Sequence, residues 1–212
     1  MKNLHFLKTT IRLVLTAGVL NIAVNASTVF NFDSDNPGTS TAFTDTVNGL
    51  SATFTSNGDP GGFVVYPSIF ETLTGNVLGD PGPAGNDGLT LDIAFSKNLS
   101  AVVFDFATSD FVTPSPLSLS AYENSTLIGT ASSTGQFLSG FTFPEGEIAF
   151  SGSNFNNLVI SSAATDFAVD NITVAAATAT PEPATTALFT IGLLALGMPW
   201  LRYQSQHRAG KH

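Results

Sequence analysis

The stretch LTLDIAFSKNLSAVVFDFA, residues 89–107, decides the fold because apolar and polar side chains alternate in it twice. In residues 89–95 the odd-numbered positions are all apolar, and Thr90 and Asp92 lie between them. In residues 101–107 the alternation resumes with apolar residues at even positions and Asp105 between two phenylalanines. Because the pattern repeats every two residues, these apolar side chains lie on one face of an extended chain. Both segments are therefore predicted to be half-buried β-strands.

The same alternation recurs along most of the chain between residues 27 and 174. Each run is short and ends at Gly, Pro, Asn or Ser, and no segment between the two chain ends has the 3.6-residue period of an amphipathic helix. The further strands that we expect are 28–33, 41–47, 50–55, 62–66, 117–122, 126–131, 157–161 and 167–174. About ten strands at this spacing favour an all-β fold, either an antiparallel β-sandwich or a jelly roll.

The composition indicates how such a sandwich is stabilised. The chain of 212 residues has no cysteine, which excludes disulfides, and 16 of its 18 phenylalanines lie within residues 27–180. A buried aromatic side chain contributes roughly 1.5–3 kcal/mol to stability. We therefore expect the phenylalanines to form the core and assign them no functional role.

The segment FAVDNITV, residues 167–174, contains a change of parity. The apolar pair before Asp170 and the apolar pair after Asn171 fall on opposite faces of a regular strand. A β-bulge near Asp170-Asn171 would return both pairs to the core. This segment resembles the last strand of carbohydrate-binding-module and galactose-binding-type jelly rolls. The resemblance implies that an acidic residue here can join an N-terminal segment in a structural calcium site.

An N-terminal segment with suitable oxygen atoms is present. Asn31, Asp33 and Asp35 alternate, so their side chains share one face if the segment is extended. Oxygen ligands suit Ca²⁺, and together with Asp170 these residues are the candidate calcium ligands. The alternative is that they are solvated carboxylates that keep the domain soluble. A second oxygen-rich segment, GDPGPAGNDG (residues 79–88), is more typical of a turn-rich connection than of a metal loop.

The first 26 residues have the pattern of a secretory signal peptide. Three basic residues lie within the first twelve positions, and residues 13–24 are largely apolar. The small residues around Ala26 indicate cleavage by signal peptidase between Ala26 and Ser27. The alternative is a short buried helix. We expect an exported mature chain that begins at Ser27.

The C-terminal 32 residues have a three-part pattern. Pro181-Glu182-Pro183 is followed by an uncharged run at residues 184–201, and then by Arg202 and Arg208 in a basic tail that ends at residue 212. Eighteen helical residues reach about 27 Å, close to the hydrocarbon core of about 30 Å. The run is therefore predicted to be a single transmembrane helix with its basic tail in the cytoplasm.

This pattern resembles the PEP-CTERM sorting signal of exported bacterial proteins. The resemblance implies that an exosortase, a membrane-embedded cysteine protease, recognises Pro181, Glu182 and Pro183, with Arg202 and Arg208 as the basic stop. Two features of this segment differ from the family's usual pattern. The arginines are spread out, and the tail continues for ten residues past Arg202. The expected organisation is a signal peptide at 1–26, an exported domain at 27–174, a linker at 175–180 and the sorting signal at 181–212.

The exported part has few residues that could support catalysis. Residues 27–180 contain 15 acidic residues and one base, Lys97, for a net charge of −14, and all three histidines lie outside them. This excludes Ser-His-Asp and Cys-His triads, imidazole metal sites and an arginine clamp for phosphate. So acidic a chain is not expected to bind nucleic acid. A pair of carboxylates, as in glycoside hydrolysis, is the enzymatic possibility that remains.

Three hypotheses for function follow. The first is a non-enzymatic protein of the cell surface or extracellular matrix, membrane-anchored before processing and associated with exopolysaccharide. The second is a carbohydrate-binding module with Tyr66 and Tyr122 as ligand-binding rings, since the domain has no tryptophan. The third is a glycan-active enzyme that uses two carboxylates. Its candidate pairs are Asp105 with Asp110 and Glu145 with Glu147.

Overall fold

The computed structural model describes residues 27–57, 62–80 and 89–177. The predicted signal peptide, the Pro-Glu-Pro segment, the predicted membrane span at 184–201 and the basic tail lie outside the described residues. Within the described part of the chain, no element is a helix with the length and hydropathy needed to cross a bilayer.

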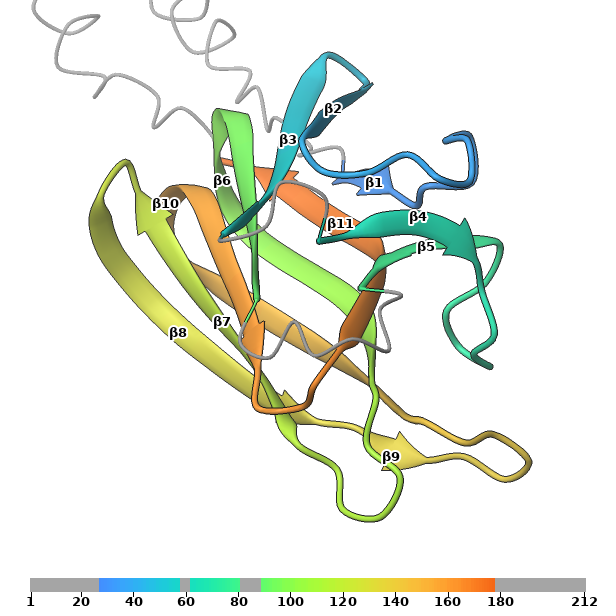
Figure 1. The fold of residues 1–212 in the computed structure, drawn as a ribbon. Helices are drawn as coiled ribbons and strands as arrows, with labels where there is room; N and C mark the ends of the chain where they lie inside the picture. The colour runs from blue at the N-terminus through green and yellow to red at the C-terminus, as the bar shows by residue number, and fades with distance from the viewer. Residues whose placement is uncertain (1–26, 58–61, 81–88, 178–212) are drawn as a thin grey trace, which may run out of the picture. The chain divides into compact units, whose positions relative to one another are not determined.

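The described residues form an all-β fold of eleven strands, which confirms the predicted fold class (Figure 1). The central path through the sheet runs β4-β5-β11-β6-β10-β7-β8, and every strand pair is antiparallel. β1 pairs with β11, β2 with β3, β3 with β6, and β9 with β10. The strands are β1 (Ser27–Phe30), β2 (Phe43–Val47), β3 (Leu50–Asn57), β4 (Val64–Pro67), β5 (Asn76–Gly79), β6 (Thr90–Thr108), β7 (Pro116–Glu123), β8 (Thr126–Thr134), β9 (Gln136–Phe137), β10 (Pro144–Ser162) and β11 (Phe167–Ala176).

Two of these strands are much longer than predicted. The expected strands 89–95 and 101–107 are parts of one strand, β6, which bends over near the top of the view in Figure 1. The first part of β6 pairs with β3 and the end of β10, whereas the second part pairs with β11 and the start of β10. The register between β6 and β10 shifts on either side of Phe155, where the ladder is irregular. These irregularities allow both strands to bend.

The bends place two halves of the sheet around one core. Odd-numbered apolar residues of β6 before the bend and even-numbered ones after it are buried, as the two separate alternations in the sequence require. The core therefore lies between the halves, as in a β-sandwich. Its fully buried phenylalanines come from both halves and from the segments beside them: Phe30, Phe32, Phe54, Phe63, Phe104, Phe106 and Phe155.

The predicted bulge in β11 is confirmed. Pairing with β6 shifts register between Asp170 and Thr173, and Asn171 has a φ of 53°. The apolar residues on both sides of the bulge are buried. β11 continues to Ala176, two residues past the boundary expected at 174.

The extended conformation expected for residues 28–33 is wrong beyond Phe30. β1 ends there, Phe32 has a φ of 56°, and the amide of Asp35 donates to the carbonyl of Phe32 over 3.0 Å. This turn points the ring of Phe32 into the core, where its centroid lies 5.3 Å from that of Phe54. Burial of this ring outweighs the local preference for a strand. Asn31, Asp33 and Asp35 therefore do not share the face of one strand.

Candidate functional site

A loop between β4 and β5 covers the outer face of the sheet and forms one wall of the candidate site. It closes on itself, because the Ser68 amide donates to the carbonyl of Gly75 over 2.8 Å. Leu73, near its centre, is fully buried against Ala107 and Ala168 of the sheet. We call residues 68–75 the covering loop.

Two buried carboxylates hold the covering loop to the sheet. Glu145 of β10 accepts hydrogen bonds from the amides of Glu71 (2.9 Å) and Thr72 (2.7 Å). Asp170 of β11, which is fully buried, accepts one from the amide of Thr74 (3.2 Å). Both contacts satisfy backbone donors that would otherwise lie over the sheet without a partner. Glu145 and Asp170 therefore position the loop.

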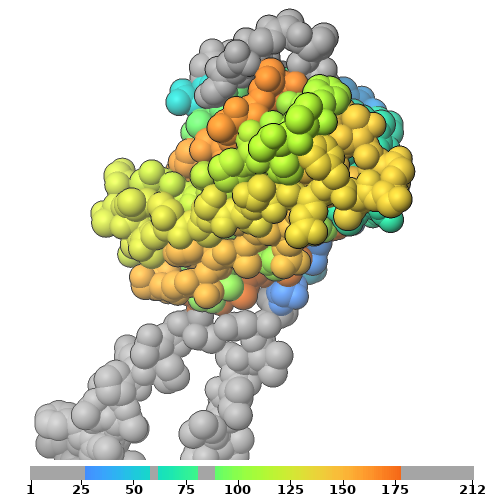
Figure 2. All heavy atoms as spheres, turned by 90° about the horizontal axis from the view of Figure 1, so that it is seen from below, coloured from blue at the N-terminus to red at the C-terminus, as the bar shows by residue number. Residues whose placement is uncertain are grey.

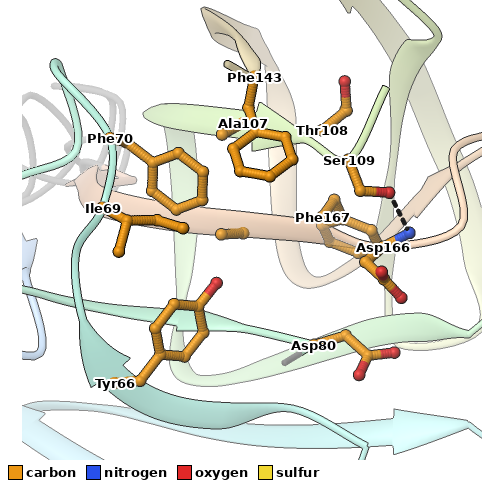
Figure 3. A pocket seen from close by; sticks show the side chains of 11 residues that line it. Tyr66, Ile69, Phe70, Asp80, Ala107, Thr108, Ser109, Phe143, Asp166 and Phe167 are labelled. Carbon is orange, nitrogen blue, oxygen red and sulfur yellow. Dashed lines mark hydrogen bonds between the residues drawn. The ribbon is translucent and has the colours of Figure 1, made fainter. Parts of the chain in front are cut away.

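A cavity of about 270 Å³ opens beside this loop, where β6 ends and β11 begins (Figure 3). Its walls contain four aromatic side chains, of Tyr66, Phe70, Phe143 and Phe167, and two carboxylates, of Asp80 and Asp166. The lining residues are Tyr66, Ile69, Phe70, Asp80, Ala107, Thr108, Ser109, Phe143, Asp166, Phe167 and Ala168.

Tyr66 extends from β4 toward the middle of the cavity, as Figure 3 shows. Burial, followed by the negative charges of Asp166 and Asp80, raises the pKa of Tyr66 to about 12. Its phenol is therefore protonated at neutral pH and can donate a hydrogen bond. The phenol of Tyr66 lies directly over Gly79. If Gly79 carried a Cβ, that atom would be only 2.7 Å from the Tyr66 phenol oxygen and 2.8 Å from the Cβ of Ala168. Only glycine allows this close approach.

The two cavity carboxylates belong to segments that are fastened through their backbones. Asp166 exchanges two hydrogen bonds with Ser109: the Ser109 amide donates to the Asp166 carbonyl (3.0 Å), and the Asp166 amide donates to the Ser109 hydroxyl (2.9 Å). The Asp80 amide donates to the carbonyl of Phe167 (3.1 Å). These backbone hydrogen bonds hold Asp80 and Asp166 beside Phe167, the first residue of β11.

Exposed aromatic rings continue the cavity wall onto the surface. The ring of Phe143 lies 5.8 Å from that of Phe70 and 5.4 Å from that of Phe111, between centroids. Phe111 is 70% exposed, and Ile69 at the cavity rim is 64% exposed. The green and gold segments that carry Phe111 and Phe143 lie side by side on the face shown in Figure 2. We call Phe70, Phe143 and Phe111 the aromatic ridge.

The structure separates the two tyrosines that the sequence singles out. Tyr66 lines the cavity, whereas Tyr122 is half-buried on β7, opposite Asn157 of β10, and does not line it. Neither ring is an exposed flat platform.

Of the two carboxylate pairs named from the sequence, Glu145 and Glu147 line one cavity together, whereas Asp105 and Asp110 do not. Asp110 accepts hydrogen bonds from the Thr108 hydroxyl (2.8 Å) and the Ser115 amide (2.7 Å), so it shapes a turn. Asp105 lies opposite Glu147 across the β6–β10 ladder, and both line a second cavity of about 380 Å³ together with Glu145. The structure thus pairs Asp105 with Glu147, rather than with Asp110.

The candidate calcium ligands do not form one cluster of carboxylates in the described residues. Burial, and to a smaller extent the charge of Asp33, raises the pKa of Asp170, whereas burial, and then the charge of Asp45, raises the pKa of Asp35. The Asp33 carboxylate accepts from the amide of Asn76 (2.9 Å) and the side chain of Asn31 (3.1 Å). Within the described ranges, no group of three or more His, Cys, Asp or Glu side chains is arranged to hold a metal ion. Calcium binding stays a prediction.

Sequence reasoning missed most of the cavity. Asp166, Phe70 and Phe143 lie in turns between strands, where no periodic pattern marks them. In the sequence, Asp80 stands out only as part of an oxygen-rich turn.

Comparisons with known proteins add likenesses of fold. No family model and no curated protein sequence matches the chain. Among solved structures, the K2 cleaved adhesin domain of Lys-gingipain has a TM-score of 0.48 and 14% identity, and the match covers 70% of this chain and 99% of that one. The family 6 carbohydrate-binding module CsCBM6-3 from Clostridium stercorarium, solved with cellobiose, has a TM-score of 0.36 and 14% identity, with coverages of 66% and 93%.

A third similar structure is the C-terminal family 6 module of a laminarinase from Zobellia galactanivorans. Its TM-score is 0.33 with 12% identity, and the match covers 58% of this chain and 98% of that one. The neighbours thus include carbohydrate-binding modules, the group of folds that the segment FAVDNITV resembles. At these identities and scores they carry no functional conclusion, which has to come from the site itself.

Proposed function

We propose that the β-domain is a non-enzymatic glycan-binding domain and that its ligand occupies the cavity beside the covering loop. The observation that carries this proposal is the combination of Tyr66, Phe70 and Phe143 with Asp80 and Asp166 around one cavity. A pyranose ring has an apolar face of C–H groups, which packs on aromatic rings, and hydroxyls around its edge, which donate to carboxylates.

The cavity suits such a ligand better than a purely apolar one. An apolar ligand would offer no hydrogen bond to the polar groups in the cavity wall, such as the Tyr66 phenol, which is costly. Sugar hydroxyls can accept a hydrogen bond from the Tyr66 phenol. The volume of about 270 Å³ lies just below the range of about 300–1,000 Å³ for small-molecule pockets. The cavity therefore accommodates a short part of a glycan, and the aromatic ridge is placed to contact the next residue.

The test is binding of cello-, xylo- and chito-oligosaccharides by the full chain, measured by calorimetry in mild detergent. Phe143→Ala is expected to weaken binding at least roughly fivefold, because it removes an aromatic contact of about 1 kcal/mol. The matched control is Phe141→Ala, which removes a phenylalanine that is outside the cavity lining and exposed. Equal weakening by both variants, or no binding of any oligosaccharide by the unmodified chain, would contradict the proposal.

A second candidate function is glycan hydrolysis. It is favoured by one observation, because Asp80 and Asp166 come from different segments and line the same cavity, as the two carboxylates of a glycosidase do. The two functions are separated by incubating the unmodified chain with the bound oligosaccharide. New reducing ends that disappear in Asp166→Asn would identify an enzyme.

We further propose that the domain is delivered to the cell surface or extracellular matrix by the PEP-CTERM-like segment. Signal-peptide removal, exosortase processing and association with exopolysaccharide belong to this proposal, which the sequence of both chain ends supports. In cells, intact mass is expected to reveal a released species that ends near residue 180. That species should be absent when Pro181, Glu182 and Pro183 are all replaced by alanine. A full-length membrane form in both strains would contradict processing.

A further inference from the structure

The first and last described residues of the β-domain lie at the same end of it. Ser27, the first residue of β1, pairs with Ala175 of β11. Two residues later, the amide of Ala177 donates to the carbonyl of Asn98 over 2.9 Å. Asn98 lies between the two parts of β6 that pair with different neighbours. We call the end of the domain that carries Ser27, Asn98 and Ala177 the exit end.

The turn between β7 and β8 and the irregular part of β10 complete the exit end. The side chain of Asn98 donates to the carboxylate of Glu123, the last residue of β7, over 3.2 Å. Asn124 and Asn156 exchange two hydrogen bonds: the Asn124 amide donates to the Asn156 side chain (2.9 Å), and the Asn156 side chain donates to that of Asn124 (3.3 Å). The exit end is therefore built mainly from uncharged polar groups.

The one basic residue of the β-domain also lies at this end. Lys97 precedes Asn98, is exposed, and is the only lysine or arginine between positions 27 and 177. The other charged residue in the segments that form the exit end is Glu123, which accepts the hydrogen bond from Asn98. Charge is therefore balanced at the exit end, although residues 27–180 contain 15 acidic residues and one base.

The acidic residues beside the candidate cavity are too far from the exit end to counteract Lys97. β11 begins at Phe167, which lines the cavity, and ends at Ala176, next to the exit end. Its ten residues span up to about 30 Å at about 3.3 Å per residue. The Debye length at physiological ionic strength is about 8 Å. A charged surface that meets the exit end would thus interact mainly with Lys97 and Glu123.

The sequence keeps the exit end close to the predicted membrane span. That span begins at residue 184, seven residues after Ala177. A fully extended chain advances at most about 3.6 Å per residue, so these seven residues reach no further than about 25 Å. In a membrane-anchored precursor, Ala177 is therefore held near the bilayer surface.

We propose that the exit end docks on the anionic phospholipid surface of the bilayer in the membrane-anchored precursor, with Lys97 facing the headgroup phosphates. This inference rests on the membrane-anchored delivery proposed above, and it adds the face of the domain that meets the membrane. Lysine and asparagine side chains both donate hydrogen bonds to phosphate oxygens. Docking by this end leaves the candidate cavity up to about 30 Å from the lipid and open to glycans outside.

The experiment measures which end of the domain meets the lipid. Because the chain has no cysteine, a fluorophore can be attached to a single introduced one. Ser125→Cys labels the exit end, and Ser139→Cys labels the turn between β9 and β10; both side chains are exposed. The full chain is reconstituted into vesicles of phosphatidylethanolamine and phosphatidylglycerol that contain a lipid with a spin-labelled headgroup. We expect strong quenching of the label at position 125 and weak quenching at 139.

A tether alone would also keep the exit end near the bilayer, so the decisive comparison is electrostatic. At about 0.15 M salt, Lys97→Gln is expected to lower the ratio of docked to undocked domain about fivefold, the effect of one lysine near an anionic surface. Replacing phosphatidylglycerol by phosphatidylcholine should have at least that effect. The matched control is Thr142→Glu, which changes the net charge by the same one unit at an exposed position beside the cavity residue Phe143. It should leave quenching unchanged.

Three outcomes separate docking from anchoring. Quenching at position 125 that is independent of phosphatidylglycerol or of Lys97 would overturn docking but leave the membrane-anchored precursor intact. Equal losses in Lys97→Gln and Thr142→Glu would also overturn docking, because the charge of the whole domain would then be responsible. A full chain that does not float with the vesicles would overturn the membrane anchor, and docking with it.

Discussion

Phe54→Ala is expected to lower the free energy of unfolding by about 3–5 kcal/mol, the range for truncating a fully buried phenylalanine. Phe54 lies on β3 with an exposed fraction of 0%. Its ring centroid is 5.3 Å from that of Phe32, 5.0 Å from that of Phe43 and 6.3 Å from that of Phe30. Truncation therefore removes three aromatic contacts at once.

The loss is large relative to the stability of a domain of this size, about 5–15 kcal/mol. No disulfide compensates, since the chain has no cysteine. Urea unfolding followed by circular dichroism measures the change, with Phe137→Ala as the control because that side chain is 41% exposed. If both variants lost the same stability, the aromatic cluster would not be the main source of core stability.

Raising the pH from about 4 to about 8 is expected to destabilise the domain through Asp170. Burial, with smaller contributions from the charges of Asp33 and Asp105, raises the pKa of Asp170 from 3.8 to about 7, against hydrogen bonds from the Asn171 and Thr74 amides that lower it. Between these two values the folded protein holds a proton that the unfolded chain has released. Stability from this group is therefore fully present below pH 3.8 and is lost as the pH rises to about 7.

The size of this effect follows from the difference between the two pKa values. At about 1.4 kcal/mol per unit, a shift from 3.8 to about 7 corresponds to at most about 4.5 kcal/mol. Asp170→Asn removes the titration, so its stability should fall less steeply over this pH range than that of the unmodified protein. Urea unfolding at several pH values measures both slopes. Equal slopes would show that another group is responsible.

The same carboxylate connects stability to the candidate site. Asp170 and Glu145 hold the covering loop, and this loop contributes Ile69 and Phe70 to the cavity. Loss of the contact between Asp170 and Thr74 would loosen one wall of the cavity without altering any lining residue.

Local pattern in the sequence was sufficient for most of the strands, the β11 bulge and the phenylalanine core, but not for β5, β9 or the first part of β10. Alternation with a period of two depends only on which face of an extended chain is buried, so it can be read within a few residues. The parity change around Asp170-Asn171 predicted the bulge for the same reason. Composition by itself likewise established that residues 27–177 contain neither histidine nor cysteine.

The tertiary structure alone decided where β6 continues and what surrounds the cavity. Residues 90–108 form one bent strand because both halves pair with β10, a segment far away in the sequence. Asp80 and Asp166 meet at one cavity because β5 and β11 are neighbours, and Phe143 joins them from the turn before β10. Such proximity depends on long-range strand pairing and on burial of the covering loop. The periodicity of a single strand contains no information about either.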